Sequence, residues 1–452
     1  MKRVAFFLFL NMLAILQTWG QVSYQSVGFQ SVLAGPIDKT IVRELHAPTS
    51  ISYVEMQGGH FFVYHDGDTN NLYALKIGDE LYVNDFVIEN DTVFFCGRNS
   101  SSSIGIIGHF KISDFFFNSG SYTTTDYSFY SVSEPVGTFD KMCTYTIYNE
   151  RRLALIGQLP SGTYVVAEVQ YDPLTTAWNY SIGELPTSYG ESLLAITATD
   201  NYVITAGFYA QGNYVFPCMR IYDMQSLFMS NGPQDTKYYD YSFFLDDQRF
   251  EDGQIVLSHA LGDNFTVATF WHGIGIGTYM GLHTISNNTV SLSGNIFTTQ
   301  MLIAGGWKLR GMTPANTAGD FYLLQNADYP GETQLVDLIF EVNISDFISL
   351  GQLPMRLRPD PFLQSIDSRG NGVGFVSNGY YITQQNMLGF YNSFTQTPLF
   401  CFSPLNVSYS NTQMTCLTSV APFSLAATQV MNSFQTYVGQ FVDWQIELGC
   451  ID

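Results

Sequence analysis

The amino-acid sequence predicts an all-β fold, and three observations lead to this prediction. Charged residues make up only 13% of the chain, whereas Tyr, Phe and Gly occur 29, 36 and 39 times. Few charges with many aromatic and turn-forming residues are typical of extracellular β proteins. Short apolar runs also recur between Gly, Asn, Asp and Ser residues, as in strands joined by turns. The third observation is a strand pair that returns along the chain.

The returning strand pair has a recognisable sequence. VFFCG at 93–97 is followed by GHFKISDF at 108–115, and VITAG at 203–207 is followed by MRIYD at 219–223. LIFEVNISDF at 338–347 ends on an echo of the first pair. Repetition on this scale indicates an array in which each unit buries its apolar face against its neighbours.

The spacing of the strand centres predicts a β-propeller. Successive centres lie roughly 43 to 62 residues apart, which exceeds the WD40 period and brackets the kelch period. Each unit is then expected to form four short strands, which make one propeller blade. The centres lie near 93, 153–157, 203, 265–269, 321–324, 380–383 and 423–427.

These seven centres predict about seven four-stranded blades, with six or eight as alternatives. We expect the ring to close through both termini, because closure protects the sheet edges. The hairpin at 61–77 is expected to complete the blade that the C-terminal strands form. A pair of β-sandwiches is a competing architecture, but it does not explain the echo between 108–115 and 338–347. A β-helix needs a shorter period. Single helical turns are expected only after strands, at 112–117 and 344–350.

The first 20 residues have the layout of a secretory signal peptide. Lys2 and Arg3 precede an apolar run from 4 to 16, and the small residue Gly20 comes before Gln21. An uncleaved membrane anchor is the alternative. No linker divides the rest of the chain, so we expect 21–452 to form a single domain. That domain would be secreted, periplasmic or displayed at the cell surface, without membrane insertion after the signal is removed.

The chain is strongly acidic. It carries 18 Lys and Arg residues against 39 Asp and Glu residues, a net charge of −21. Phosphate groups are bound by clustered Lys and Arg side chains. The charge therefore argues against nucleic acid and against anionic membranes as partners.

The six cysteines are candidates for disulfide bridges, and one acidic loop is a candidate for a calcium site. Disulfides are expected in an oxidising compartment. Cys401 and Cys416 are the predicted pair, because a short polar connection separates them; buried, unbridged thiols are the alternative. No C-x-x-C motif occurs. The calcium-like run Asp66–Asn71 lacks the Gly and the Glu of a calcium loop, so a hairpin turn explains it. We expect no cofactor and no metal.

A family resemblance rests on two phrases, DTVFFCG at 91–97 and GIIGHF at 105–110. Both are similar to uncharacterised secreted propeller-like proteins of Bacteroidetes-type bacteria. The resemblance implies a secreted propeller that spans most of the mature chain. It implies no catalytic residue and no substrate.

The candidate ligand-binding residues come from two segments. The first segment is dense in aromatic residues and carboxylates, and the second meets a glycine-rich bend at 273–277. Exposed aromatic rings stack on sugars, while carboxylates accept hydrogen bonds from sugar hydroxyls. The competing interpretation is that the aromatic residues fill the core and the carboxylates are solvated. The candidates are Tyr239, Tyr241, Asp246, Asp247, Trp271 and His272.

These features favour a secreted, non-enzymatic protein that binds a glycan or an extracellular protein through one face of a propeller. Neither a Gly-x-Ser-x-Gly nor a His-Glu-x-x-His motif is present. The first alternative is a carbohydrate-active enzyme, a glycoside hydrolase or lyase, with carboxylates at the central channel. The second alternative is a structural component of a surface assembly.

Overall fold

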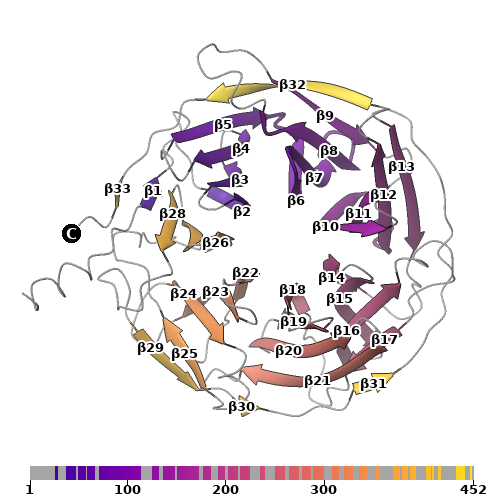
Figure 1. Ribbon diagram of the computed structural model, residues 1–452, viewed down its shortest axis with the longest axis vertical. Helices are drawn as coiled ribbons and strands as arrows, with labels where there is room; N and C mark the ends of the chain where they lie inside the picture. Colours follow the sequence, from indigo (N-terminus) through magenta and orange to yellow (C-terminus); the bar gives the residue numbers. More distant parts are fainter. Residues whose placement is uncertain are drawn as a thin grey trace, which may run out of the picture.

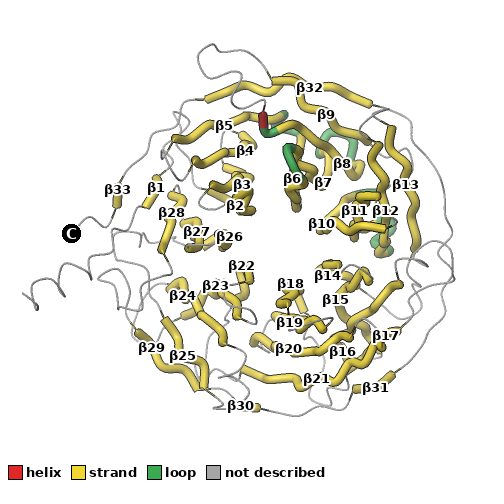
Figure 2. Tube along the Cα trace, in the orientation of Figure 1, coloured by secondary structure: helices red, strands yellow, loops and turns green. Residues whose placement is uncertain are grey.

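A computed structural model describes thirty-three strands and several of the turns between them (Figures 1 and 2). The described turns are residues 78–80, 90–91, 100–103, 112–113, 136–137 and 159–163. Side chains are described within residues 38–113, 136–170 and 192–207, and at Arg220.

Most strands fall into runs of four that are consecutive in the chain and antiparallel to one another. The first two runs are β2 (Ile37–His46), β3 (Thr49–Met56), β4 (Gly59–Asp66) and β5 (Asn71–Ile77), then β6 (Leu81–Glu89), β7 (Thr92–Asn99), β8 (Ile104–Lys111) and β9 (Thr125–Ser131). The next two are β10 (Thr138–Ile147), β11 (Glu150–Gln158), β12 (Tyr164–Asp172) and β13 (Ala177–Glu184), then β14 (Ser192–Ala198), β15 (Tyr202–Gln211), β16 (Tyr214–Asp223) and β17 (Asp235–Tyr239).

The second half of the chain continues the same pattern. Two further runs are β18 (Phe250–His259), β19 (Asn264–Gly273), β20 (Gly277–Ser286) and β21 (Thr289–Thr299), then β22 (Lys308–Pro314), β23 (Asp320–Asp328), β24 (Leu335–Asn343) and β25 (Gln352–Arg356). The last run is β26 (Gly370–Val376), β27 (Gly379–Gln384) and β28 (Met387–Asn392), and the N-terminal β1 (Ser26–Gly28) is its fourth strand.

The sheets stand around a common centre in Figure 1. The first strand of each run lies nearest that centre, and the fourth strand lies toward the outside. We call these first strands the inner strands; they are β2, β6, β10, β14, β18, β22 and β26.

In the described part of the chain, C-terminal strands lie along the outer edge of every run except β10 to β13. We call them the C-terminal belt; it consists of β29 (Pro404–Ser408), β30 (Ser410–Asn411), β31 (Cys416–Thr418), β32 (Phe434–Val442) and β33 (Leu448–Gly449). Along the belt, β29 pairs with β25, β30 with β21 and β31 with β17. β32 then pairs with both β9 and β5, and β33 pairs with β1. All of these pairings are antiparallel.

The all-β prediction is confirmed for the described residues, and six of the seven predicted centres are strands. The six correspond to β7, β11, β15, β19, β23 and β27, each the second strand of its run. This common position is the reason for their regular spacing. The seventh centre, 423–427, lies outside the described residues. The helical turn expected at 112–117 is described only at Ile112 and Ser113, where Ser113 has helical backbone, and 344–350 is not described.

The predicted hairpin at 61–77 is confirmed as β4 and β5, but its neighbours differ from the expectation. It completes a run that begins with β2 and β3, neither of which was predicted from the sequence. Charged residues interrupt the apolar pattern of β2, whose sequence is IDKTIVRELH. The C-terminal β32 does lie along the outer edge of β5.

The apolar core lies between the faces of neighbouring sheets. Alternate residues of β7 point to opposite faces: Phe95 joins a cluster with β3, β4 and β5, while Phe94 and Cys96 pack with β10, β11 and β12. In the next sheet, Leu155 belongs to the second cluster, and Ile156 packs toward β14 and β15. Because both faces are covered, the second strands have nearly continuous apolar sequences instead of alternating ones.

A β-bulge recurs in all the inner strands near their first residues. In each case one residue of the inner strand has no partner on the following strand. Such an extra residue bends the inner strand and increases its twist. The skipped residues are Asp38, Asn84, Asp140, Leu194, Glu251, Arg310 and Asn371.

Three glycines opposite these bulges leave room for a backbone carbonyl. A Cβ atom on Gly97 would lie 1.8 Å from the oxygen of Tyr82, and one on Gly207 would lie 1.8 Å from the oxygen of Ser192. The corresponding distance for Gly157 is 2.2 Å, to the oxygen of Thr138. The bulge therefore explains why the repeated strand phrases end in glycine.

We predict that Gly97→Ala lowers the free energy of unfolding by about 1–3 kcal/mol or more, because β6 or β7 must shift to admit the methyl group. Gly137→Ala is the matched control, since its Cβ would meet nothing closer than 3.4 Å. Urea unfolding of both variants checks the prediction, and equal stabilities would contradict it.

Candidate functional site

The structure describes three of the six residues predicted from the sequence, and only by their backbone. Tyr239 is the last residue of β17, where it pairs with Cys416 of the belt. Trp271 and His272 lie in β19 of another sheet, just before the glycine-rich bend, and Gly273 pairs with Gly277 across it. The predicted bend is therefore a β-hairpin. Tyr241, Asp246 and Asp247 lie outside the described residues.

The register of β19 assigns Trp271 and His272 to repeated positions. Trp271 corresponds to Val54, Phe95, Leu155 and Thr205 in the four earlier runs, all at most 1% exposed. His272 corresponds to the half-buried Glu55 and to Cys96, Ile156 and Ala206, of which the last three are at most 1% exposed. The equivalence favours a core position for Trp271 and does not separate the two interpretations for His272.

A polar network on the inner strands β2, β6 and β10 is the most developed site among the described side chains. Its centre is the three bulge residues and the residues close to them, near the beginning of each strand, and Arg43 joins from further along β2. No sequence motif marks this network; the local signal is a polar residue two to four positions into each of these three strands. Hydrogen bonds join Lys39, Arg43, Asn84, Asp85, Thr138 and Asp140, and Asp38 and Lys141 lie next to them in sequence.

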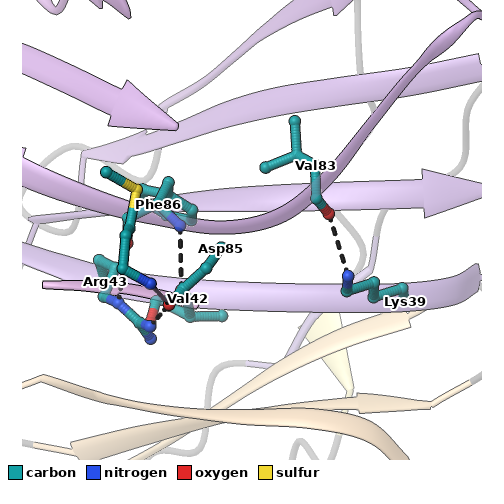
Figure 3. Close-up of polar contacts among 7 residues, drawn as sticks. Lys39, Val42, Arg43, Val83, Asp85 and Phe86 are labelled. Carbon is teal, nitrogen blue, oxygen red and sulfur yellow. Dashed lines mark hydrogen bonds and ion pairs between the residues drawn. The ribbon is translucent and has the colours of Figure 1, made fainter. Parts of the chain in front are cut away.

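Asp85 links the inner strands of three consecutive runs through one buried carboxylate. Its Oδ1 accepts hydrogen bonds from Arg43 Nη2 at 2.7 Å and from the backbone N–H of Phe86 at 2.9 Å (Figure 3). Its Oδ2 accepts a hydrogen bond from the backbone N–H of Met142 at 3.0 Å. The side chain is only 5% exposed. A buried carboxylate needs this number of partners, because an unpaired charge in the interior is strongly unfavourable.

Arg43 reaches across from β2 to make this link. Its Nε donates a hydrogen bond to the carbonyl of Phe86 at 3.2 Å, and its guanidinium lies 5.7 Å from the centre of the Phe86 ring. The planar guanidinium suits this combination of ion pair and ring contact.

A second chain of hydrogen bonds runs around the inner strands. Lys39 Nζ donates to the carbonyl of Val83 at 3.0 Å (Figure 3) and to Oδ1 of Asn84 at 3.2 Å. Asn84 Nδ2 in turn donates to Oγ1 of Thr138 and to the carbonyl of Phe139, both at 2.9 Å. Lys39, beside the first bulge residue, thus contacts β6, and the bulge residue Asn84 contacts β10.

Two groups in this network have shifted pKa values. Burial, and then the nearby charge of Lys141, lower the pKa of Lys39 from 10.5 to about 8. Burial also raises the pKa of Asp140, despite the hydrogen bond from Thr138 and the cations nearby. Desolvated charged groups at a sheet end are suited to polar ligands, because bound ligand atoms replace the missing water.

The remaining bulge positions extend this pattern around the centre. Asp38 is exposed, and Asn84 and Asp140 are half-buried. Among the other four positions, only Leu194 is apolar; Glu251, Arg310 and Asn371 are polar and are described by their backbone alone. Bulges that re-aim side chains are frequent next to binding and active sites.

A separate buried cluster, away from the bulges, has a structural role. Glu168 Oε1 accepts hydrogen bonds from Arg152 Nη1 at 2.6 Å and from the hydroxyl of Tyr145. Burial and the Glu168 carboxylate raise the pKa of Tyr145. The three residues satisfy one another within the sheet of β10, β11 and β12.

The cysteine and metal predictions remain mostly outside the described residues. Cys401 is not described, and Cys416 begins β31. Cys96 and Cys143 carry free thiols, and burial raises the pKa of both. Asp66 ends β4 and Asn71 begins β5, as expected for a hairpin. Within the described part of the chain, no cluster of His, Cys, Asp and Glu is arranged to hold a metal, and no helix is long and apolar enough to cross a membrane.

No family model matches the sequence, and no curated protein matches it either.

We predict that Asp85→Ala lowers the free energy of unfolding by about 3–5 kcal/mol, because it leaves Arg43 and two backbone N–H groups without their partner. Asp79→Ala is the control: Asp79 is 70% exposed and pairs with Lys76 at 3.1 Å, so its loss should cost at most about 1 kcal/mol. Chemical denaturation measures both effects. A loss below 1 kcal/mol for Asp85→Ala would show that the link is dispensable.

We predict that Trp271→Ala destabilises the protein by about 3–5 kcal/mol, as expected for a large side chain removed from a core. Thermal unfolding together with a glycan-binding assay checks this. An unchanged melting temperature with lost binding would instead support Trp271 as a ligand-binding residue.

Proposed function

We propose that this chain is a secreted β-propeller of seven four-stranded blades that binds a glycan where its inner strands bulge. The repeated bulge carries the proposal, because it brings polar residues to one end of six of the seven inner strands. The other parts of the proposal are a closed ring, a secreted location and a polyhydroxylated ligand.

Contacts between inner strands support the ring. β2 contacts β6, β6 contacts β10, and the series continues through β14, β18 and β22 to β26, which contacts β2. Such a cyclic order is what a propeller requires. β1 pairs with β28 on one side and with β33 on the other. This arrangement supports closure through both termini, since strands from both ends of the described chain meet in one sheet.

The composition supports a secreted location and the class of ligand. The apolar N-terminal run and the propeller-like phrases at 91–97 and 105–110 both favour export. A net charge of −21 disfavours polyanions. Carboxylates and amides at the bulges suit sugar hydroxyls, which donate and accept hydrogen bonds. A glycan is therefore favoured over a protein partner, because charged residues are depleted at the cores of protein interfaces.

A carbohydrate-active enzyme is the second candidate, and one observation favours it. A glycosidase acid must hold its proton near neutral pH, which requires a raised pKa. Burial raises the pKa of Asp140, and its neighbours Asn84 and Thr138 are polar. Asp140 would be the acid in such a reaction.

A screen of glycans and polysaccharides, scored for both binding and cleavage, tests the proposal. We predict that Asp38→Asn weakens glycan binding at least about tenfold, the equivalent of 1.4 kcal/mol. The melting temperature should not change, because Asp38 is exposed. Asp79→Asn, an exposed acid in a turn between β5 and β6, is the matched control and should bind like the wild type.

The outcomes of the screen separate the two candidates. Binding without cleavage supports the binding protein. Cleavage that Asp140→Asn abolishes supports the enzyme. If no glycan binds the wild type, or if Asp38→Asn binds as well as the wild type, the bulge site is not the ligand site.

A further inference from the structure

One strand of the C-terminal belt joins two sheets. Residues 434–439 of β32 pair with β9, and residues 440–442 pair with β5. In Figure 1, β32 lies outside both of these strands. Among the described strands it is also the sole ladder connection between the first two runs, since the nine-stranded sheet passes from β5 to β9 through β32.

The sequence of β32 is suited to transfer between molecules. The strand reads FQTYVGQFV, nine residues without a charge or a proline. Its inner edge is held by backbone ladders, which any copy of the same segment can form. The neighbouring belt strands are weaker anchors: β31 pairs through three residues with β17, and β33 pairs through two residues with β1.

We propose that the outer edges of β5 and β9 form a strand-binding site that accepts β32 from a second copy of this chain. Two copies would exchange β32 reciprocally and form a closed, two-fold symmetric dimer. No new interface is required, because each copy offers the edge that β32 already occupies within one chain.

A second copy fits this site better than an unrelated partner. The exchanged strand meets the same β9 residues in the same register, so that Val438 lies opposite Asp126 and Thr436 lies opposite Ser128. The strand itself carries no charge, so the ladders that it forms in the second copy contain no charge pair beyond those of the closed chain. Exchanged and closed forms have the same ladders, and protein concentration therefore sets their ratio.

A disulfide trap in the full chain tests the exchange. Asp126→Cys with Val438→Cys places two thiols on paired residues of β9 and β32. Paired Cα atoms in antiparallel strands lie about 4.5–5.5 Å apart, within the range that a disulfide spans. After oxidation, a closed chain is cross-linked to itself, whereas an exchanged pair becomes a covalent dimer.

The sample is exposed to sub-denaturing urea and then returned to buffer at low and at high protein concentration before oxidation. We predict that the covalent dimer fraction on a non-reducing gel rises at least about fivefold from micromolar to hundreds of micromolar protein. The controls are Asp126→Cys alone and Val438→Cys alone, each with the six native cysteines kept. Neither should give such a rise, which excludes cross-links from the native thiols.

A second pair, Ser128→Cys with Thr436→Cys, repeats the test at another position of the same ladder in case the first variant fails to fold. Cross-links confined to single chains at all concentrations would overturn the exchange. If neither pair forms a cross-link, β32 does not occupy the β9 edge, and the proposal also fails. Because the readout is covalent mass and not ligand binding, this result is independent of the glycan screen.

Discussion

The sheets whose side chains are described are apolar on both faces, and this constraint determines how they pack against one another. On β7, Phe95 packs with β3, β4 and β5, while Phe94 and Cys96 pack with β10, β11 and β12. A sheet of this kind is stable only between two others, because an uncovered face would expose a large apolar area to water. A series of such sheets has an exposed face at each end unless the series returns to its start.

Backbone polar groups need additional hydrogen-bond partners at two places in this arrangement, the bulged inner strands and the edges of the outer strands. At the inner strands, the bulges disrupt the regular ladder with the second strands, and side chains near the bulges link β2, β6 and β10 to one another. Asp85 joins β2 and β10 through Arg43 and the Met142 N–H, and Asn84 makes a similar connection to Thr138. A polar network that is well satisfied fixes the register of its strands. It also concentrates desolvated polar groups at one end of the inner strands, where a hydroxyl-rich ligand would find partners.

The outer strands pose the opposite problem, because each presents an unpaired edge of N–H and C=O groups. Among the described strands, the C-terminal belt covers six of these seven outer edges, all except that of β13, and β32 covers two of the six. The edges are therefore completed by residues far away in sequence. Under the exchange proposal, the same device supports the surface-assembly role considered as an alternative, since the edge accepts a strand from either molecule.

The sequence by itself determined the class of fold and the phase of its repeat. Apolar runs such as VFFCG and VITAG identified the second strands correctly, because these strands are buried on both faces and are followed by a glycine that a bulge requires. The apolar pattern did not predict the inner strand β2, because exposed and half-buried charged residues interrupt it. Only the tertiary structure decided which polar residues meet. Lys39, Asn84 and Thr138 come from three different runs of strands, and the bulges that align them follow from strand register, which a single sequence does not encode locally. The belt could not be predicted for the same reason. Its pairings join residues from 48 positions apart, as in Arg356 and Pro404, to 423 positions apart, as in Ser26 and Gly449, and backbone hydrogen bonds leave little trace in side-chain identity.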